Sequence, residues 1–513
     1  MEVNISDLTW DKFIYPRGGK SEKTISAYIE ALAIGAQFPS IKIQRVFNYA
    51  DGNETTEVTI ILDGIHRWLA FKESGIKKIA AVEWKDKPLD YEKNKTALLL
   101  ESAKCNISHG DRLSPGDKKR IAREIATSDQ ECKWSEEALA EKLGVIQQTV
   151  NTWISDIRAR QKAGRNTVIL RLSRLGWPQE KISEIVGINQ QRISQITNNT
   201  NFSEIGNLLS QGHDMDYISR HCHMDLALIW ALRLEGKTDQ EKFKELGWGL
   251  RTWDQWNFNE CLPREIHVND KQSVFHLGDE RFGDDWPGRI PAQLVAHTLF
   301  YFTNPGDLIF DPMAGGGVVS DVCLVFERKC QSFDLATSDN RPEIQYHHWD
   351  PQDGHWPITK KPDLIFFDPP YYTKKEKEYK GKANEKTPSI SSYSKGEYEK
   401  FLESFFLLAH QNVKEMTRMA FLNADWRDFQ STPALKENSD NSITIFDYHR
   451  MLSETGWKVT HRIECPLSSE RMSGDQVQKM KEKRILGTVG RTLIIARKWG
   501  EAIMRDNNYQ LIE

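Results

Sequence analysis

The residues best suited to chemistry stand in the segment Asp368-Pro369-Pro370-Tyr371, directly after the apolar run 364–367. A short apolar run is typical of a parallel strand covered on both faces, and the prolines end it because they lack N–H donors. The Asp368 carboxylate and the Pro369 carbonyl can each accept an N–H hydrogen bond, and Tyr371 can stack on a flat ring. The segment therefore suits an amine carried by an aromatic ring. Tyr372 is equally suited to lining a pocket and to packing.

A glycine-rich segment, 311–317 (DPMAGGG), lies at a second predicted strand end. The apolar run 307–310 precedes it, and a predicted helix, 318–326, follows it. Glycines at a strand-to-helix junction let a ligand lie against the backbone. The next predicted strand, 328–333, ends in Asp334, where nucleoside-binding folds hold ribose hydroxyls. We expect these acids and glycines at the carboxyl edge of one parallel sheet, where open α/β sheets bind ligands.

The elements that must position these residues belong to a chain of several domains, as 513 residues require. Residues 1–95 mix strands and helices and predict a small α/β domain, whereas 96–240 are helical by their pattern. The segment 241–284, rich in Trp, Asp and Gly, is predicted to be a connection. In 285–513 apolar strands alternate with helices, which predicts a doubly wound α/β domain.

Over about residues 285–498, the order of these motifs resembles the amino-group DNA methyltransferases that use S-adenosylmethionine (SAM). The resemblance implies a Rossmann-like fold and methyl transfer to the exocyclic amine of a base flipped out of the duplex. It assigns catalysis to Asp368, Pro369, Pro370 and Tyr371. It assigns cofactor binding to the glycine segment, to two later acids and to the start of a helix before the first strand, namely Asp311, Pro312, Met313, Ala314, Gly315, Gly317, Asp334, Asp353 and Pro291.

The target base is predicted from the residue in front of Pro-Pro-Tyr. Asp368 at this position resembles the adenine-N6 enzymes more than the cytosine-N4 enzymes, where Ser is commoner, so adenine N6 is expected and cytosine N4 is the alternative. An RNA guanine-N2 methyltransferase is a further alternative, because similar motifs occur there. A protein of another class, a non-catalytic ParB-like partition protein with a degenerate enzyme domain, is disfavoured because the acids and glycines of the motifs are intact.

A repeated spacing marks the helical region. The segments 136–154 and 179–196 each carry a small residue, a glycine four residues later and an apolar residue six residues after that. This spacing is that of helix-turn-helix units, whose second helix can enter the major groove of DNA. A third copy, 216–232, has Cys222 in place of the glycine and is expected only to pack. The predicted DNA-contacting residues, including two from the lysine-rich segment after the catalytic motif, are Gln147, Gln148, Asn189, Gln191, Arg192, Lys374 and Lys375.

A different motif stands near the N-terminus, where residues 63–70 (DGIHRWLA) follow a predicted strand at 58–62. Gly64 lets the backbone approach a ligand, and His66 and Arg67 stand at a helix N-terminus, which favours anions. Together with Tyr15-Pro16-Arg17 and residues 106–112 (NISHGDR), the segment resembles ParB-like partition proteins. The resemblance implies a pocket for CTP or another nucleotide, bound by Gly64, His66 and Arg67, followed by helix-turn-helix DNA binding.

Composition sets limits on partners. The net charge of −4 does not itself indicate a nucleic-acid binder, but Lys and Arg gather in 158–192 and after the catalytic motif. Double-stranded DNA is therefore the expected partner, and a homodimer stays open. The seven cysteines form no CxxC pair, and adjacent residues of His221-Cys222-His223 diverge on a helix, so no metal site is expected. Without a signal pattern or a membrane-length apolar run, a cytoplasmic location and no membrane partner are expected.

Overall fold

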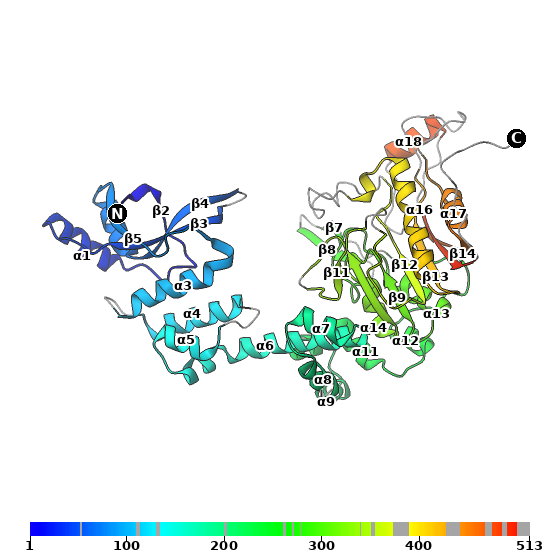
Figure 1. Cartoon of the computed structure of the whole chain (residues 1–513), viewed down its shortest axis with the longest axis horizontal. Helices are drawn as coiled ribbons and strands as arrows, with labels where there is room; N and C mark the ends of the chain where they lie inside the picture. The colour runs from blue at the N-terminus through cyan, green and yellow to red at the C-terminus, as the bar shows by residue number, and fades with distance from the viewer. Residues whose placement is uncertain are drawn as a thin grey trace. The chain divides into compact units, whose positions relative to one another are not determined.

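The computed structural model describes residues 1–51, 54–108, 113–129, 134–199, 203–259, 263–268, 271–276, 279–338, 340–349, 354–372, 389–426, 442–466, 474–484 and 490–499. The chain divides into two compact units, Met1–Lys162 and Ala163–Glu513. Each unit contains a β-sheet of its own (Figure 1).

A six-stranded sheet organises the first unit, in the order β1-β5-β3-β4-β2 with β6 paired to β3. Strands β3 and β4 are antiparallel, whereas β5 and β6 run parallel to β3. The strands are β1 (Glu2–Asn4), β2 (Leu8–Thr9), β3 (Ile41–Asp51), β4 (Glu54–Asp63), β5 (Lys78–Glu83) and β6 (Leu89–Asp90).

Helices bury one core against this sheet, in which Ile60 of β4 shares a cluster with Leu98 of α3 and Ile121 of α4. Helix α4 shows how sequence sets a boundary: Pro115 is its first residue, and Ser114 and Asp117 form a capping box. The helices are η1 (Ile5–Asp7), α1 (Glu22–Ala33), α2 (Ile65–Glu73), α3 (Tyr91–Ser108), α4 (Pro115–Ser128), α5 (Glu136–Leu143) and α6 (Gln147–Arg174).

The division between the units falls inside the segment 96–240 that the sequence predicts as one helical domain. Val150 and Ile154, in the first half of α6, belong to the core of the first unit. Ile169 and Leu172, in its second half, belong to the core of the second unit. The boundary differs from the predicted one because α3, α4 and α5 bury their apolar faces with the N-terminal sheet, while the later helices pack with the C-terminal domain.

Short helices open the second unit: α7 (Gln179–Val186), α8 (Gln190–Asn199), α9 (Ser203–Ser210), α10 (Met215–Cys222), α11 (Leu226–Arg233) and α12 (Asp239–Glu245). Gly144 and Gly187, with φ of 60° and 68°, end α5 and α7 in the left-handed conformation. In the third copy His223 takes this conformation, one residue after Cys222. Five successive residues of α11 are buried and the helix contacts α14, so the third copy packs, as expected.

A seven-stranded sheet forms the C-terminal domain, in the order β11-β10-β9-β12-β13-β15-β14. The first five strands are parallel, which confirms the predicted α/β class. Strand β15 runs antiparallel to its neighbours β13 and β14, so β14 has the same direction as the first five strands. The strands are β9 (Leu308–Asp311), β10 (Lys329–Asp334), β11 (Ile344–Tyr346), β12 (Leu364–Phe367), β13 (Arg418–Asn423), β14 (Trp457–Pro466) and β15 (Gly490–Lys498).

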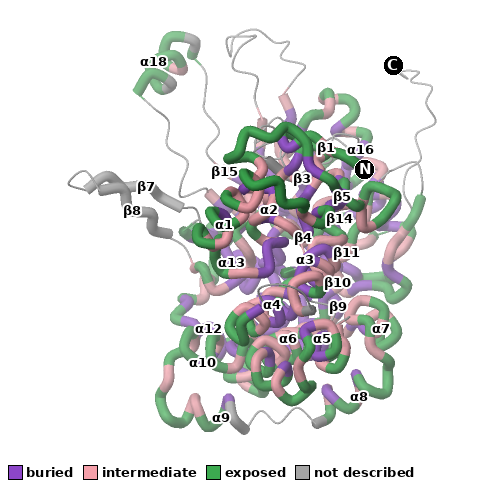
Figure 2. Tube along the Cα trace, turned by 90° about the vertical axis from the view of Figure 1, so that its left-hand side faces the viewer, coloured by how far each residue is buried: buried purple, intermediate pink, exposed green. Residues whose placement is uncertain are grey.

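The core of this domain lies between the sheet and its connecting helices. Phe405 of α16 stacks on Phe367 of β12 with a centroid separation of 4.1 Å. Figure 2 shows buried residues along the sheet and mostly exposed or intermediate residues on α8. The remaining elements are α13 (Ala292–Phe302), α14 (Val318–Val325), η2 (Ile390–Ser392), α16 (Lys395–Asn412), α17 (Ile445–Glu454) and α18 (Gly474–Lys483), with the hairpin β7 (Pro263–Val268) and β8 (Lys271–His276) inside the predicted connection 241–284.

Among the helices that the structure describes, none has both the length and the apolar character needed to cross a membrane.

Candidate active site

Three carboxylates meet at the carboxyl edge of the seven-stranded sheet. Asp311 ends β9, Asp334 ends β10 and Asp368 follows β12. These strands are neighbours and run parallel, with Asp311 in register with Ser332 of β10. All three acids line one cavity. The sequence places each acid at a strand end, and the strand order brings them together.

The cavity separates the predicted residues into two sets. Those that line it are Asp311, Met313, Ala314, Gly315, Asp334, Asp368 and Pro370, whereas Pro291, Pro312, Gly317, Pro369 and Tyr371 are not among its lining residues. Pro291 instead caps α13, and the residues 286–290 before it form part of the wall. Pro312 accepts a hydrogen bond from Trp349 Nε1 at 2.8 Å through its carbonyl. The predicted residues Asp353, Lys374 and Lys375 lie outside the described residues.

Asp311 is the most buried of the three acids, with an exposed fraction of 2%. Its Oδ2 atom has no hydrogen-bond partner among the described residues. Burial raises the pKa of Asp311 well above its usual value, and the neighbouring Cys330, Asp334 and Asp368 act in the same direction. A buried carboxyl with an unused acceptor atom is suited to a ligand that brings a positive charge or a donor.

Asp334 holds the glycine loop through a hydrogen bond to its backbone. Its Oδ2 atom accepts a hydrogen bond from Gly315 N–H at 2.8 Å, and its Oδ1 atom accepts one from Ala336 N–H at 2.9 Å. Each carboxylate oxygen can accept more than one hydrogen bond. Asp334 therefore fixes the loop from the cavity wall.

The three glycines are required by close neighbours. A Cβ atom on Gly315 would lie 3.0 Å from the Trp286 ring, and one on Gly316 would lie 2.7 Å from the Asp284 carbonyl oxygen. Gly317 caps α14 with a φ of 80°, and its Cβ would lie 3.1 Å from the Arg341 guanidinium. The loop is therefore enclosed by 284–286 and by Arg341, and only glycine fits at these positions.

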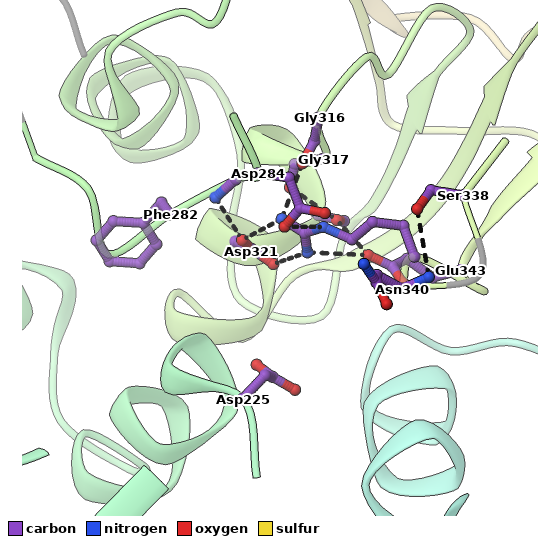
Figure 3. Close-up of polar contacts among 12 residues, drawn as sticks. Asp225, Phe282, Asp284, Gly316, Gly317, Asp321, Ser338, Asn340 and Glu343 are labelled. Carbon is purple, nitrogen blue, oxygen red and sulfur yellow. Dashed lines mark hydrogen bonds and ion pairs between the residues drawn. The ribbon is translucent and has the colours of Figure 1, made fainter. Parts of the chain in front are cut away.

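A buried ion cluster contacts the glycine loop at the Gly316 carbonyl oxygen (Figure 3). Arg341 donates to the Gly316 carbonyl oxygen at 2.8 Å and pairs with both carboxylate oxygens of Asp321 at 2.7 and 2.8 Å. Arg171 of α6 contacts Asp321 as well and donates to Glu343 Oε1 at 2.8 Å. Burial acts to raise the pKa of Asp321, but the charges of Arg171 and Arg341 outweigh it and hold that pKa below its usual value.

The turn of residues 368–372, which the sequence predicts to be catalytic and which is called the catalytic turn below, carries two tyrosines with different surroundings. Tyr372 is 8% exposed, and its ring lies 5.4 Å from Tyr398 and 5.0 Å from Trp426, centroid to centroid. It is not among the residues that line the cavity. Of the two alternatives for Tyr372, packing is therefore the one that the structure supports. Tyr371 is half-buried beside it.

Several residues that line the cavity belong to none of the sequence motifs. Trp286 covers the glycine loop, His347 and Trp349 follow β11, and Tyr393 precedes α16. Each reaches the cavity through a tertiary contact with a segment distant in the sequence. Of these residues, Trp286 has a local signal, because it stands directly after the Trp- and Asp-rich segment 241–284.

A second cavity lies in the first unit and brings the three ParB-like segments together. It is lined by Tyr15, Pro16, Arg17, Gly64, His66, Arg67 and Asn106, among others. Arg17 donates to Asn106 Oδ1 at 3.0 Å, so the first and third segments touch. Residues 109–112 of the third segment lie outside the described residues.

Gly64 and the residues after it are fixed by local contacts. Gly64 caps α2 with a φ of 93°, and a Cβ there would lie 2.5 Å from Ile41 Cγ2. His66 Nε2 accepts a hydrogen bond from Ser21 N–H at 3.0 Å. Arg67 donates to Asp63 Oδ2 at 2.7 Å and to the Pro39 carbonyl oxygen at 2.5 Å. The Arg67 charge is thus partly balanced by Asp63.

The predicted DNA-contacting residues of the helix pairs are exposed. Gln147 and Gln148 stand in the first turn of α6, and Asn189, Gln191 and Arg192 stand at the start of α8. Asn189 Oδ1 accepts a hydrogen bond from Arg192 N–H at 2.8 Å, which caps α8. The Arg192 guanidinium donates to Gln195 Oε1 at 3.0 Å on the same exposed face.

His221 stacks on Tyr217 of α10, with ring centroids 5.7 Å apart. In the part of the chain that the structure describes, no group of three or more His, Cys, Asp and Glu side chains is arranged to hold a metal ion.

Comparison with known proteins gives similarity in parts of the chain. No family model matches the chain. No curated protein matches it either. Among solved structures, TrmN from Thermus thermophilus is similar over 41% of this chain and 49% of its own length, at 14% identity and a TM-score of 0.23. This chain therefore spans about half of the TrmN chain.

Two further solved structures are each similar over part of this chain. The geranyl diphosphate C-methyltransferase of Streptomyces coelicolor A3(2), in complex with S-adenosyl-L-homocysteine, covers 40% of this chain and 79% of its own, at 12% identity and a TM-score of 0.27. The partitioning protein ParB of Caulobacter crescentus, complexed with CTP-gamma-S, covers 30% of this chain and 76% of its own, at 17% identity and a TM-score of 0.17. These TM-scores lie below 0.5, so the proposals below rest on the residues of the two cavities.

Proposed function

We propose that the C-terminal α/β domain is a SAM-dependent methyltransferase that modifies the exocyclic amine of a base in DNA, with adenine N6 as the target. The observation that carries this proposal is the cavity that joins Asp311, Asp334 and Asp368 to a glycine loop at the carboxyl edge of a parallel sheet. A nucleoside-containing cofactor and an amine acceptor site thus share one wall.

The residues present fit SAM. Its sulfonium and ammonium groups are positively charged, and the cavity offers three carboxylates, one of which has an unused buried oxygen. Asp334, at the end of β10, would hold the ribose hydroxyls, and the glycine loop with the N-terminus of α14 would hold the methionine part close to the backbone. When bound, SAM supplies an electrophilic methyl group.

The chain's own residues supply orientation. An exocyclic amine is a poor nucleophile because its lone pair is delocalised into the ring. The Asp368 carboxylate accepts one of its N–H bonds and the Pro369 carbonyl accepts the other, which localises the lone pair and directs it toward the cofactor site. Tyr371 stacks on the flipped base. Adenine N6 is favoured over cytosine N4 because an aspartate precedes the two prolines.

Duplex DNA is the proposed partner. The exposed first turns of α6 and α8 carry Gln147, Gln148, Asn189, Gln191 and Arg192. Side chains of these types hydrogen-bond base edges and phosphates, and the major groove of B-form DNA admits a helix. The major groove of A-form RNA does not, which makes the RNA guanine-N2 alternative the weaker one.

The test is transfer of label from methyl-labelled SAM to DNA amplified in vitro, which carries no modification. The wild type is expected to label DNA, and digestion to nucleosides is expected to place the label in N6-methyladenine rather than N4-methylcytosine. Asp368→Ala is expected to lower transfer by at least about 100-fold, since it removes one of the two acceptors, while SAM still binds in calorimetry. Label in RNA but not in DNA would favour the guanine-N2 reading. Tight DNA binding without label in either nucleic acid would favour the non-catalytic partition-type protein.

The first-unit cavity is the second candidate, as a nucleotide site. Its support is the meeting of Tyr15-Pro16-Arg17, Gly64-Ile65-His66-Arg67 and Asn106 around one cavity at the N-terminus of α2. CTP is the expected ligand and ATP the comparison, both with Mg²⁺, in titration calorimetry. Arg67→Ala is expected to abolish the heat, whereas Arg45→Ala, on the exposed face of β3, is expected to leave it unchanged. Absence of heat with both nucleotides would leave the segment a structural role only.

A further inference from the structure

A chain of buried hydrogen bonds ends on the catalytic turn. Tyr398 of α16 donates its hydroxyl proton to the Pro370 carbonyl oxygen at 3.2 Å. Asn423, the last residue of β13, donates from Nδ2 to the Tyr398 hydroxyl oxygen at 3.1 Å. The Tyr448 hydroxyl of α17 lies 3.2 Å from Asn423 Oδ1 and 3.1 Å from the Ala424 carbonyl oxygen, the two acceptors for its proton. Three separate elements thus hold the backbone that follows Asp368.

The direction in which these hydrogen bonds are donated is determined by the contact of Asn423 with the Ala424 N–H. Asn423 Oδ1 accepts a hydrogen bond from Ala424 N–H at 2.8 Å, so the amide oxygen must face Ala424 and the amide nitrogen must face Tyr398. Because Tyr398 receives a proton from Asn423, its own hydroxyl proton is left to donate to Pro370. The order of donors follows from one backbone N–H.

The side chains that form these hydrogen bonds are also buried from solvent. Tyr398, Asn423 and Tyr448 have exposed fractions of 0%, 2% and 1%. Burial raises the pKa of Tyr398, and the charge of Asp368 acts in the same direction, so the hydroxyl keeps the proton that it donates. A hydrogen bond shielded from water is electrostatically stronger than an exposed one.

The hydrogen bond to the Pro370 carbonyl also restrains the Pro369 carbonyl, because the rigid ring of Pro370 lies between the two groups. Between the carbonyl groups of Pro369 and Pro370 lie one planar peptide bond and two backbone rotations of Pro370. The pyrrolidine ring locks φ, so ψ is the single free rotation. A hydrogen bond that holds the Pro370 carbonyl restrains this ψ, and the direction of the Pro369 carbonyl is then set as well.

We propose that Tyr398 is a positioning residue for the methyl-transfer reaction: by holding the Pro370 carbonyl it aims the Pro369 carbonyl at the amine of the target base, with Asn423 fixing the direction of its donation. This inference rests on the proposed methyltransferase function. It adds residues that touch neither cofactor nor base and that no motif of the sequence contains.

The experiment compares Tyr398→Phe with the wild type in single-turnover transfer from labelled SAM to in vitro amplified DNA. Loss of the hydroxyl is expected to slow transfer by about 10- to 100-fold, the range that follows from a small misplacement of a reacting geometry. SAM affinity in calorimetry is expected to stay within about twofold, because Tyr398 does not line the cavity. Tyr346→Phe, on an exposed residue of β11, is the matched control and is expected to transfer at the wild-type rate.

A second variant tests the direction of hydrogen-bond donation while it leaves the Tyr398 hydroxyl in place. In Asn423→Asp, a carboxylate oxygen replaces the amide nitrogen that donates to Tyr398. The Tyr398 hydroxyl then donates to this oxygen and no longer to Pro370, while Ala424 and Tyr448 keep their acceptor. The same slowing is expected with unchanged SAM affinity.

The outcomes separate the inference from the function on which it rests. A wild type that labels no nucleic acid overturns both. A wild type that labels DNA with Tyr398→Phe and Asn423→Asp at the same rate overturns the positioning role and leaves the methyltransferase intact. Equal losses of rate, SAM affinity and melting temperature would identify these residues as structural only and overturn the proposal as well.

Discussion

Arg341 donates a hydrogen bond to the carbonyl oxygen of Gly316 at 2.8 Å, and Asp284 N–H donates to the same oxygen at 2.8 Å. This carbonyl belongs to the peptide in front of Gly317, the N-cap of α14. The conformation of the glycine loop is thus set by two partners that lie 25 residues after and 32 residues before it in the sequence. The loop is therefore built before any cofactor arrives, which reduces the ordering cost of binding.

Gly317→Ala tests this support. Gly317 has a φ of 80° and Gly212 a φ of 79°, but a Cβ at Gly317 would meet Arg341 at 3.1 Å, while Gly212 has no described atom within 4 Å of that position. Both variants are expected to lower the free energy of unfolding by about 1–2 kcal/mol, because alanine is strained in this conformation. Only Gly317→Ala is expected to weaken SAM binding, by about tenfold if the shift of the loop costs about 1.4 kcal/mol. Calorimetry with SAM checks the difference, and equal affinities for the two variants would contradict it.

Arg171 and Arg174 stand one turn apart on α6 and allow a second comparison. Arg171 is buried among Asp321 and Glu343, whereas Arg174 pairs with the half-exposed Glu235. Arg171→Met leaves the buried carboxylates of Asp321 and Glu343 with one buried cation, Arg341, so one negative charge is uncompensated. The free energy of unfolding is therefore expected to fall by about 3–5 kcal/mol. Arg174→Met removes a surface pair and is expected to cost at most about 1 kcal/mol. The measurement is urea unfolding of both variants, and a loss of at most about 1 kcal/mol for Arg171→Met as well would show that the cluster is not stabilising.

The raised pKa of Asp311 predicts that cofactor binding is linked to the release of a proton. Its pKa in the folded protein lies well above the usual 3.8, so the folded state holds a proton that the unfolded chain releases above that value. Stability gained from this proton is present at low pH and is lost as the pH rises through the folded pKa. A positive cofactor lowers the pKa, so SAM binding is expected to release a proton and to strengthen with pH until Asp311 ionises.

Calorimetry in two buffers with different ionisation enthalpies measures this proton directly. The wild type is expected to show different observed binding enthalpies in the two buffers. Asp311→Asn has no titrating group at this position and is expected to show one enthalpy in both. Buffer-dependent binding that persists in Asp311→Asn would assign the proton to another group.

Arg192 predicts a specific loss in DNA binding. It is exposed at the start of α8, next to the capping residue Asn189. Arg192→Ala is expected to weaken binding to duplex DNA and, if it neutralises one phosphate, to reduce the slope of log affinity against log salt by about 0.9. Arg220→Ala, on the exposed face of α10, serves as the control and is expected to leave the slope unchanged. A slope that responds equally to both variants would indicate a diffuse charge effect.

The acids of the site could be predicted from sequence because each follows an apolar strand. Asp334 and Asp368 stand at or directly after the ends of β10 and β12, as the apolar runs indicate. Even here the boundary moves by one residue: Asp311 belongs to β9, since it pairs with Ser332 in the ladder. The sequence pattern of a strand marks only its apolar residues. The hydrogen-bonded strand also includes a polar last residue when the backbone of that residue still pairs with the neighbouring strand.

The supporting residues could not be predicted, because their partners are distant in sequence. Arg341, Tyr398 and Trp286 act on the glycine loop or the catalytic turn only after the sheet has brought them there. The division into units has a related cause. Helical periodicity predicts helices in 96–240 but contains no information on which sheet each apolar face will cover, so the sequence predicts one helical domain where the structure divides the helices between two units.

Helix α6 has a consequence for how such a chain could be rearranged. Its first turn carries Gln147 and Gln148, and its last turn carries Arg171, which reaches the ion cluster behind the cofactor loop. A cut between the units at residue 162 would leave the second unit with Ile169 and Leu172 on a helix that has lost its first sixteen residues. A rearrangement that exchanges the first unit for another would therefore preserve the buried contacts of Arg171 most readily when its crossover point spares the whole of α6.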